Sequence, residues 1–360
     1  RLTQPPFDAS AMDGYAVRAE DVAELPARLR LIGVAAAGSG FLGRVSEREA
    51  VRIYTGAPVP DGADTVVIQE NTKIADGAIV IEQAEPGWHI RPRGQDFREG
   101  EVLLEAGTRL GARELLLAAA MNHAELPVRR KPNVAILATG DEIMPPGSEL
   151  GPDQIVSSVP YGLAALIEAE GGEPMRLGIA KDEPTSLVTL AKTGSAADIL
   201  VTVGGASVGE RDLVASALRT EGLKLDFAKI AMRPGKPLLY GRMGAQRVLG
   251  LAGNPVSALI SAHVFLKPML RRMLGLAEAA RPLPEAVLGE ALEANGPRQH
   301  YLRAVSQWGA HGARSVRPLP SQDSSLVAAL ARADCLIVRE PDAPALPSGA
   351  RVMFIALDGD

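Results

Sequence analysis

The sequence contains a single cysteine, Cys335, among its 360 residues. One thiol excludes an intrachain disulfide framework and any metal site built from several cysteines. Cys335 lies in an apolar run, so we expect an inert core thiol. The five histidines show no metal-ligand spacing, and we expect each of them to be structural or exposed. This cysteine usage suits a reducing compartment, so we expect a cytoplasmic protein.

Long apolar runs and an excess of positive charge are also missing. No run approaches the roughly 20 residues of a membrane span, and the longest candidate, 248–270, is interrupted by Gly253, Asn254 and Pro255. The net charge of -5 leaves no basic footprint for nucleic acid. We therefore expect neither a membrane nor a nucleic acid among the partners. The chain begins at Arg1 and shows no signal peptide, and we expect that an N-terminal segment is missing.

The first third of the chain has the pattern of a β-rich domain, residues 11–96. The stretch 65–84 alternates apolar and polar residues, and Asp76-Gly77 within it indicates a hairpin turn. Between residues 97 and 131 one helix is expected, from Ala112 onwards after Gly111. The run PPFDASAMDGYAV at 5–17 predicts a structured turn, and its residue types alone predict no chemistry.

From Pro132 onwards the pattern changes to alternating strands and helices. Nearly continuous apolar runs at 133–140, 198–205 and 247–253 are typical of strands buried on both faces. Helical patterns lie between them, at 161–172, 186–194 and 212–222. This alternation predicts a doubly wound parallel α/β domain over 132–280. Residues 281–360, which follow a proline-rich seam, are expected to form a small, separate β-rich module.

Each of the three apolar strands ends in a turn of small residues: TGDE at 139–142, GGASVG at 204–209 and AGNP at 252–255. Open α/β sheets bind ligands at the carboxyl ends of their strands, and glycines such as Gly204 and Gly205 let the backbone approach a ligand closely. Three such ends favour a ligand crevice, although any one of them could be only a tight connection. The spacing fits neither the dinucleotide fingerprint nor the Walker loop.

A cationic turn and several carboxylates complete the pattern. In AMRPGKP (231–237) the prolines stiffen a loop that presents Arg233 and Lys236. This pair of cations is suited to binding a phosphate or another tetraoxo anion, although the segment could also be only a solvated basic turn. Glu142, Asp182 and Asp212 lie near strand ends or helix starts, and Asp212 could simply cap its helix. Acids beside a phosphate site indicate Mg²⁺, which binds through one or two carboxylates and substrate phosphates. The residues thus point to a nucleotide or phosphorylated substrate.

Taken together, these motifs resemble the MoeA-type molybdopterin molybdenumtransferases, whose relatives include the corresponding part of gephyrin. The resemblance runs in family order through 5–17, 52–64, 93–110, 138–143, 201–212, 229–238 and 251–259. It implies a four-domain subunit: residues 1–10 with 97–131 as a linker and dimerisation domain, then 11–96, 132–280 and a C-terminal β-barrel at 281–360. The α/β domain would share its fold with the molybdopterin adenylyltransferases.

The resemblance also implies a homodimer and a reaction. Adenylylated molybdopterin, supplied by an upstream molybdopterin adenylyltransferase, would be hydrolysed with Mg²⁺ to release AMP, and molybdate would supply molybdenum to the dithiolene. The substrate's own dithiolene would explain why no cysteine cluster is needed. A tungstate-using variant stays open, since the two oxyanions are nearly alike.

The residues that the resemblance places at the active site come from both halves of the chain. Asp13, Thr55 and Asp96 would complete the site of the other subunit, and Glu142 and Asp212 would position Mg²⁺ or pyrophosphate. The full catalytic set is Asp13, Thr55, Asp96, Glu142, Asp182 and Asp212, and the set that binds substrate or oxyanion is Gly204, Gly205, Ser207, Lys229, Arg233, Lys236, Pro237 and Asn254.

Two other functions remain open at this stage. One is the adenylyltransferase that acts one step earlier. Against it, such an enzyme requires little more than the α/β domain, whereas this chain has some 130 residues before that domain and 80 after it. The other is a non-catalytic scaffold of the gephyrin kind, against which the retained acids and cations argue.

Overall fold

The computed structural model describes residues 1–360 except 206–212, 278–281, 310–311 and 358–360. The described chain divides into two compact units, Arg1–Pro127 and Val128–Asp360. None of the described helices is both long and apolar enough to cross a bilayer. Each unit has its own core and is described separately.

The first unit is built on a six-stranded sheet with the order β5–β2–β4–β3–β7–β6. Its strands are β2 (Gly14–Val17), β3 (Ala27–Ala35), β4 (Glu49–Ile53), β5 (Thr65–Ile68), β6 (Thr72–Ala75) and β7 (Ala78–Ile81). The turn between β6 and β7 is the predicted hairpin, since Asp76 and Gly77 both have positive φ (47° and 73°) and Ala75 pairs with Ala78. A two-residue turn with both φ values positive matches the natural twist of a hairpin.

Short elements complete this unit around its two apolar clusters. They are β1 (Ala9–Ser10) paired with β8 (Ile90–Arg91), the 3-10 turns Ala19–Val22 and Gln69–Asn71, and helix α1 (Ala112–Ala120). Helix α1 begins after Gly111, as expected, and the Glu114 carboxylate accepts a hydrogen bond from the Gly111 amide at 2.9 Å. The start of the chain is tied to the segment before α1, because Gln4 forms a β-bridge with Phe97.

The second unit contains the α/β domain, whose sheet has the order β12–β9–β13–β17–β16–β14. The strands are β9 (Asn133–Thr139), β12 (Glu173–Ala180), β13 (Ile199–Val203), β14 (Lys224–Lys229), β16 (Pro237–Met243) and β17 (Gln246–Leu251). The three predicted apolar strands lie side by side at its centre and are parallel. Except for Asn133 and Arg247 near their starts, their residues are buried on both faces, which is why they have no polar alternation.

The expected parallel arrangement holds for β12, β9, β13 and β17, but one strand on the other side of the sheet is reversed. Strand β16 is antiparallel to both β17 and β14. The cause is local, because Met243 pairs with Gln246 across the turn Gly244-Ala245, and Gly244 has a φ of 57°. A turn of this length can join only antiparallel strands.

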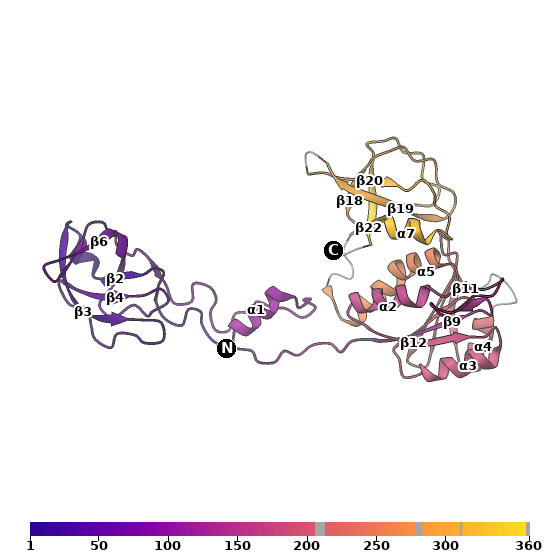
Figure 1. Cartoon of the computed structure of the whole chain (residues 1–360), viewed down its shortest axis with the longest axis horizontal. Coiled ribbons are helices and arrows are strands. Elements are labelled where there is room, and N and C mark those ends of the chain that lie inside the picture. Colours follow the sequence, from indigo (N-terminus) through magenta and orange to yellow (C-terminus); the bar gives the residue numbers. More distant parts are fainter. Residues whose placement is uncertain (206–212, 278–281, 310–311, 358–360) are drawn as a thin grey trace. The chain divides into compact units, whose positions relative to one another are not determined.

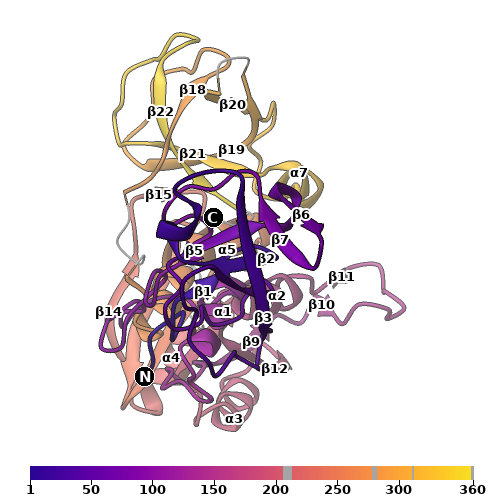
Figure 2. The same cartoon turned by 90° about the vertical axis from the view of Figure 1, so that its left-hand side faces the viewer.

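Helices cover both faces of this sheet (Figure 1). Helices α2 (Val159–Ala169), α5 (Pro255–Ser261) and α6 (Lys267–Met273) pack on one face, with the π-helical turn Ala262–Leu266 joining α5 to α6. Helices α3 (Pro184–Thr193) and α4 (Leu213–Thr220) pack on the other face. The long connection after β9 carries a two-residue parallel ladder, β10 (Ile143–Met144) with β11 (Ile155–Val156), and its tip extends away from the domain (Figure 2).

The C-terminal residues form a closed barrel in which each strand pairs with the next, in the order β19–β20–β18–β22–β21 and back to β19. Its elements are β18 (Glu285–Leu288), β19 (Gln299–Trp308), β20 (Arg314–Pro318), helix α7 (Val327–Arg332), β21 (Cys335–Arg339) and β22 (Arg351–Ala356). Cys335 is fully buried in its core, and burial raises the pKa of its thiol to about 12. The thiol is therefore inert, as expected.

The barrel and the α/β domain share a core, although the sequence suggests separate modules. Strand β15 (Met232–Arg233), which lies in the cationic turn, pairs in parallel with β19 of the barrel. Met232, Val256 and Ile260 then pack in one buried cluster with Tyr301 and Leu336 of the barrel. The loops of the barrel are consequently held at a fixed position beside the α/β domain.

Candidate functional site

The carboxyl ends of β9, β13 and β17 meet at one edge of the α/β sheet and form a pocket of about 600 Å³. This is the crevice that the three small-residue turns predict. The predicted residues among those that line it are Glu142, Asp182, Gly204, Gly205 and Asn254. The N-terminal end of α2, where Ser157, Ser158 and Val159 lie, forms another part of the wall. The amides of a helix start favour an anionic ligand.

Close backbone approach at this edge depends on Gly204. Its φ is +90°, and a Cβ at this position would lie 2.5 Å from the carbonyl oxygen of Thr139. Any side chain here would therefore separate the ends of β9 and β13. A Cβ on Gly253 would lie 3.4 Å from the Cα of Gly204, so the third strand end also reaches the same point. The glycines keep the three turns close enough to contact one ligand together.

The acidic side of the pocket is held by hydrogen bonds around Asp182. Its carboxylate accepts a hydrogen bond from the Thr139 hydroxyl at 2.9 Å, and its amide donates to the Asp141 carboxylate at 3.1 Å. Asp182 follows β12 and Thr139 ends β9, so the contact fixes an acid between two strand ends. Glu142, on the loop after β9, lies on the same pocket wall.

Asn254 contributes a buried carbonyl oxygen that a ligand could use. The residue stands at the start of α5, where a side-chain oxygen usually caps the helix, but it makes no such bond. Its Oδ1 is buried and has no hydrogen-bond partner within the part of the chain that the structure describes. A buried acceptor without a partner costs free energy unless something binds it. The site therefore offers hard oxygen donors from Glu142, Asp182 and Asn254.

The predicted cations lie elsewhere, at the seam between the α/β domain and the barrel. Lys229 ends β14 and pairs with Pro237 at the start of β16, while Arg233 lies on β15 opposite His300. The side chains of Lys229, Arg233 and Lys236 are all exposed. None of the three is among the described residues that line the 600 Å³ pocket. The structure thus orders the turn, and a joint role of its cations with the acids of the pocket stays a prediction.

Two of the predicted residues, Ser207 and Asp212, fall within 206–212 and so lie outside the described residues. Three others belong to the first unit. The Asp13 carboxylate accepts hydrogen bonds from the amide and the hydroxyl of Thr55, each at 2.8 Å, and these bonds hold the pKa of Asp13 below its usual value. The pair is exposed and joins the start of β2 to the end of β4. Asp96 is exposed as well, and its amide donates to the Gln4 carbonyl at 3.0 Å.

Sequence reasoning missed a residue of the barrel, Ser325, which also lines the pocket. The loop that carries it is ordered by Arg303, whose buried guanidinium donates to the carbonyls of Ser321, Asp323 and Leu326. The Asp323 carboxylate in turn accepts from the amide and the hydroxyl of Ser325, each at 2.8 Å. The polar stretch SQDSS at 321–325 indicates a turn, but nothing in its spacing shows that it reaches the strand ends of another domain.

Comparison with known proteins gives consistent results along the whole chain. Residues 1–122 match the MoeA N-terminal region (domain I and II), residues 135–272 a probable molybdopterin binding domain, and residues 285–357 the MoeA C-terminal region (domain IV). A molybdopterin molybdenumtransferase of Haemophilus influenzae is 34% identical over 98% of this chain and 87% of its own length. The chain belongs to the molybdopterin molybdenumtransferase family.

Other members of the molybdopterin molybdenumtransferase family agree with this assignment. A Nostoc protein of the same name is 39% identical over 86% of this chain and 72% of its own length. The crystal structure of a molybdopterin biosynthesis MoeA protein from Pyrococcus superimposes with a TM-score of 0.83 at 32% identity, covering 100% of this chain and 90% of that one. These matches confirm the resemblance and the predicted architecture, namely the β-rich N-terminal region, the central α/β fold and the C-terminal barrel. The chain is a transferase of molybdenum cofactor biosynthesis.

Proposed function

We propose that this chain inserts molybdenum from molybdate into adenylylated molybdopterin and releases AMP with the help of Mg²⁺. Water cleaves the phosphoanhydride, so AMP leaves with its own phosphate and the other phosphate stays on the molybdopterin. The two dithiolene thiols displace one oxygen of molybdate, which takes up their protons and leaves as water, and molybdenum becomes bound to the two sulfurs. The observation that carries this proposal is the pocket at the three strand ends, in a chain that belongs to the molybdopterin molybdenumtransferase family. It combines a backbone that approaches a ligand closely with carboxylates and a buried amide oxygen.

The donor set fits Mg²⁺ bound together with substrate phosphates. The described residues contain no cluster of three or more acids, histidines or cysteines that could enclose a metal ion. Mg²⁺ does not need such a cluster, because it usually keeps waters and takes one or two carboxylates plus phosphate oxygens. Glu142 and Asp182 would hold it from the pocket wall, with Asp212 as a further candidate from the sequence. When bound, the ion would neutralise charge on the pyrophosphate.

The remaining groups have roles in binding and orientation. The backbone at Gly204 and Gly205 and the start of α2 would bind the phosphates, and the unpartnered Oδ1 of Asn254 would accept a hydrogen bond from the substrate. Molybdate is a tetrahedral dianion, so we assign it to Ser207, Arg233 and Lys236, with Lys229 and Pro237 shaping the cationic turn. Asp13, Thr55 and Asp96 would complete this site from the partner subunit of a homodimer.

A turnover assay tests the proposal. The purified protein is mixed with adenylylated molybdopterin, and AMP is quantified with molybdate and Mg²⁺ present together or omitted in turn. We expect AMP release only when both are present. Equal AMP release with and without molybdate would contradict the proposal. Incubation with ATP and molybdopterin should give no adenylylation, and adenylylation would instead indicate the enzyme one step earlier.

Glu142→Gln tests whether the acidic wall of the pocket is catalytic. Glutamine keeps the shape of the side chain but removes the charge, so AMP release should fall about 100-fold or more, as for other groups that stabilise charge in the transition state. Glu149→Gln is the matched control, because Glu149 is exposed on the same loop and is not among the residues that line the pocket. The control should keep its activity. Full activity in Glu142→Gln would favour a scaffold with no working site.

A further inference from the structure

A second pocket of about 830 Å³ lies beside the first, and Ile143 and Met144 of β10 form part of its wall. Both pockets are lined by Gly140, Ile143 and Ser157, so they are neighbours that share a wall. This volume is within the range of pockets that bind cofactor-sized molecules. None of the candidate catalytic residues that the structure describes lines it, and the reaction proposed above assigns it no role.

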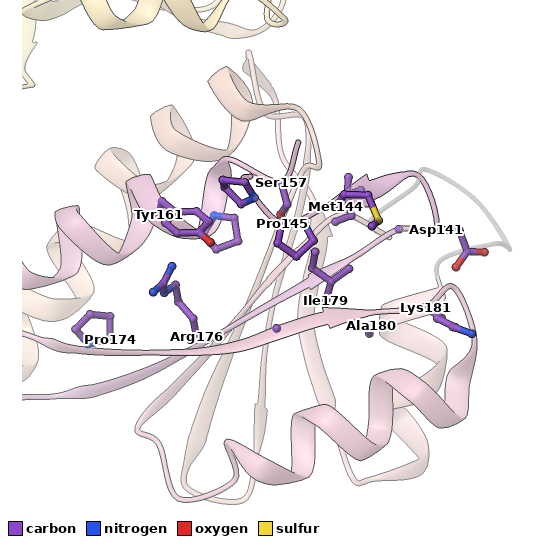
Figure 3. Close-up of a pocket in the computed structure, with 15 residues that line it drawn as sticks. Asp141, Met144, Pro145, Ser157, Tyr161, Pro174, Arg176, Ile179, Ala180 and Lys181 are labelled. Carbon is purple, nitrogen blue, oxygen red and sulfur yellow. The ribbon is translucent and has the colours of Figure 1, made fainter. Parts of the chain in front are cut away.

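The far end of this pocket has an aromatic ring and a guanidinium stacked on each other. Figure 3 shows Tyr161 of α2 and Arg176 of β12 reaching toward each other there, while Asp141 and Lys181 lie at the end nearer the strand termini. The guanidinium carbon of Arg176 is 4.3 Å from the centroid of the Tyr161 ring. The Tyr161 side chain is nevertheless 46% exposed, so much of the ring is free to contact a ligand.

The walls around this stack are mainly apolar. They include Met144, Pro145, Pro146, Pro160, Pro174 and Ile179. The edge strand β12 opens at this point through a bulge between Arg176 and Gly178, and a Cβ on Gly178 would meet no atom within 4 Å. The pocket thus combines a planar stacking platform, apolar sides and a cationic guanidinium. A flat, nitrogen-rich aromatic ring fits this combination, because it stacks on both aromatic and guanidinium planes.

We propose that this second pocket binds the flat heterocycle of the substrate, with Tyr161 and Arg176 as its stacking platform. This inference rests on the proposed function, since a molecule that carries both a heterocycle and phosphates would extend from one pocket into the other past Gly140. Lys181 lies at the end where such a phosphate would pass. Pterin and adenine share the required chemistry, and the experiment distinguishes them.

Binding is measured by calorimetry with three probes: AMP, neopterin monophosphate and ribose 5-phosphate, which has no ring system. We expect at least one of the two heterocyclic probes to bind, and Tyr161→Ala should weaken that probe by about tenfold, the size of one lost ring stack. Tyr161→Phe keeps the ring and should bind as the parent protein does. Weakening of AMP assigns the pocket to adenine, and weakening of neopterin monophosphate assigns it to the pterin.

Met175→Ala is the control for the strand itself. Met175 is 43% exposed and lies between Pro174 and Arg176 on β12, but it is not one of the residues that line the pocket. The Met175→Ala variant should bind each heterocyclic probe as the parent protein does. If Tyr161→Ala leaves both affinities unchanged, or if the parent protein binds neither probe, the proposal is wrong. Because these measurements need no turnover, a failed AMP-release assay together with a positive binding result would overturn the proposed reaction and leave the heterocycle pocket standing.

Discussion

At the residue scale, two buried histidines make the stability of the second unit depend on pH. Burial first, and then the neighbouring Arg233, Arg298, Arg303 and Arg339, lower the pKa of His300 from 6.5 to about 4. Burial and Lys267 lower the pKa of His263 to about 4 as well, while Glu170 opposes them. Both imidazoles are therefore neutral in the folded protein, yet they bind protons near pH 6.5 when the chain unfolds.

The sign of the pH effect follows from these directions. The contribution of the two histidines to the free energy of unfolding is fully present above pH 6.5 and is lost as the pH falls toward 4. Over this range the histidines bind protons in the unfolded chain but stay neutral in the folded chain. When the pH is lowered from about 7 to about 5, the free energy of unfolding should fall by about 2 kcal/mol for each histidine. Urea denaturation at several pH values measures it. His300→Gln should flatten the dependence, and an equally steep profile in that variant would show that His300 is not responsible.

At the element scale, the sequence predicts those strands whose surroundings are uniform. Strand β13 is buried along its whole length and is apolar except for Thr202, so its sequence has the pattern of a buried strand. The sequence does not predict strand β12, because it is an edge strand in which only Ala180 is fully buried, and Pro174, Arg176 and Gly178 interrupt its apolar residues. The two-residue β15 could not be predicted either, since its partner β19 lies more than 60 residues further along the chain.

The candidate site shows the same division between local and distant contacts. Glu142, Gly204 and Asn254 could be predicted because each lies just after an apolar run, and parallel strands place their carboxyl ends together. Ser325 could not, because the pairing of β15 with β19 and the shared core bring the barrel to the pocket. Such contacts depend on the packing of whole domains, which leaves no periodic signal in the sequence.

The Ser325 loop gives a prediction about this element. Arg303 is 1% exposed and donates to three carbonyls of the loop, so Arg303→Met should leave those carbonyls unsatisfied and lower barrel stability by about 2–4 kcal/mol. Loss of the loop geometry should also raise the KM for the substrate. Thermal unfolding and steady-state kinetics measure the two effects. The control is Arg317→Met, at an exposed position on β20, which should change neither the stability nor the KM. A normal KM in Arg303→Met would show that the Ser325 loop does not contribute to substrate binding.

At the scale of the whole molecule, the candidate residues are divided between two units. The Asp13 carboxylate accepts two hydrogen bonds from Thr55 in the first unit, and the pocket with Asp182 belongs to the second. In the homodimer proposed above, the first unit of one subunit would complete the pocket of the other. A homodimer with shared sites makes a quantitative prediction that a monomeric site does not.

Asp13→Asn and Asp182→Asn should each abolish AMP release alone, because each removes one charged group from every site. When the two variants are unfolded and refolded together, half of the dimers should be mixed, and each mixed dimer should regain one site with both acids intact. Activity should therefore return to about a quarter of the parent level, as random pairing in a two-fold dimer requires. Co-refolding each variant with itself is the control and should stay inactive. If the two acids served one site within the same subunit, no mixture could place both intact acids together, and a dimeric but inactive mixture would rule out the shared site.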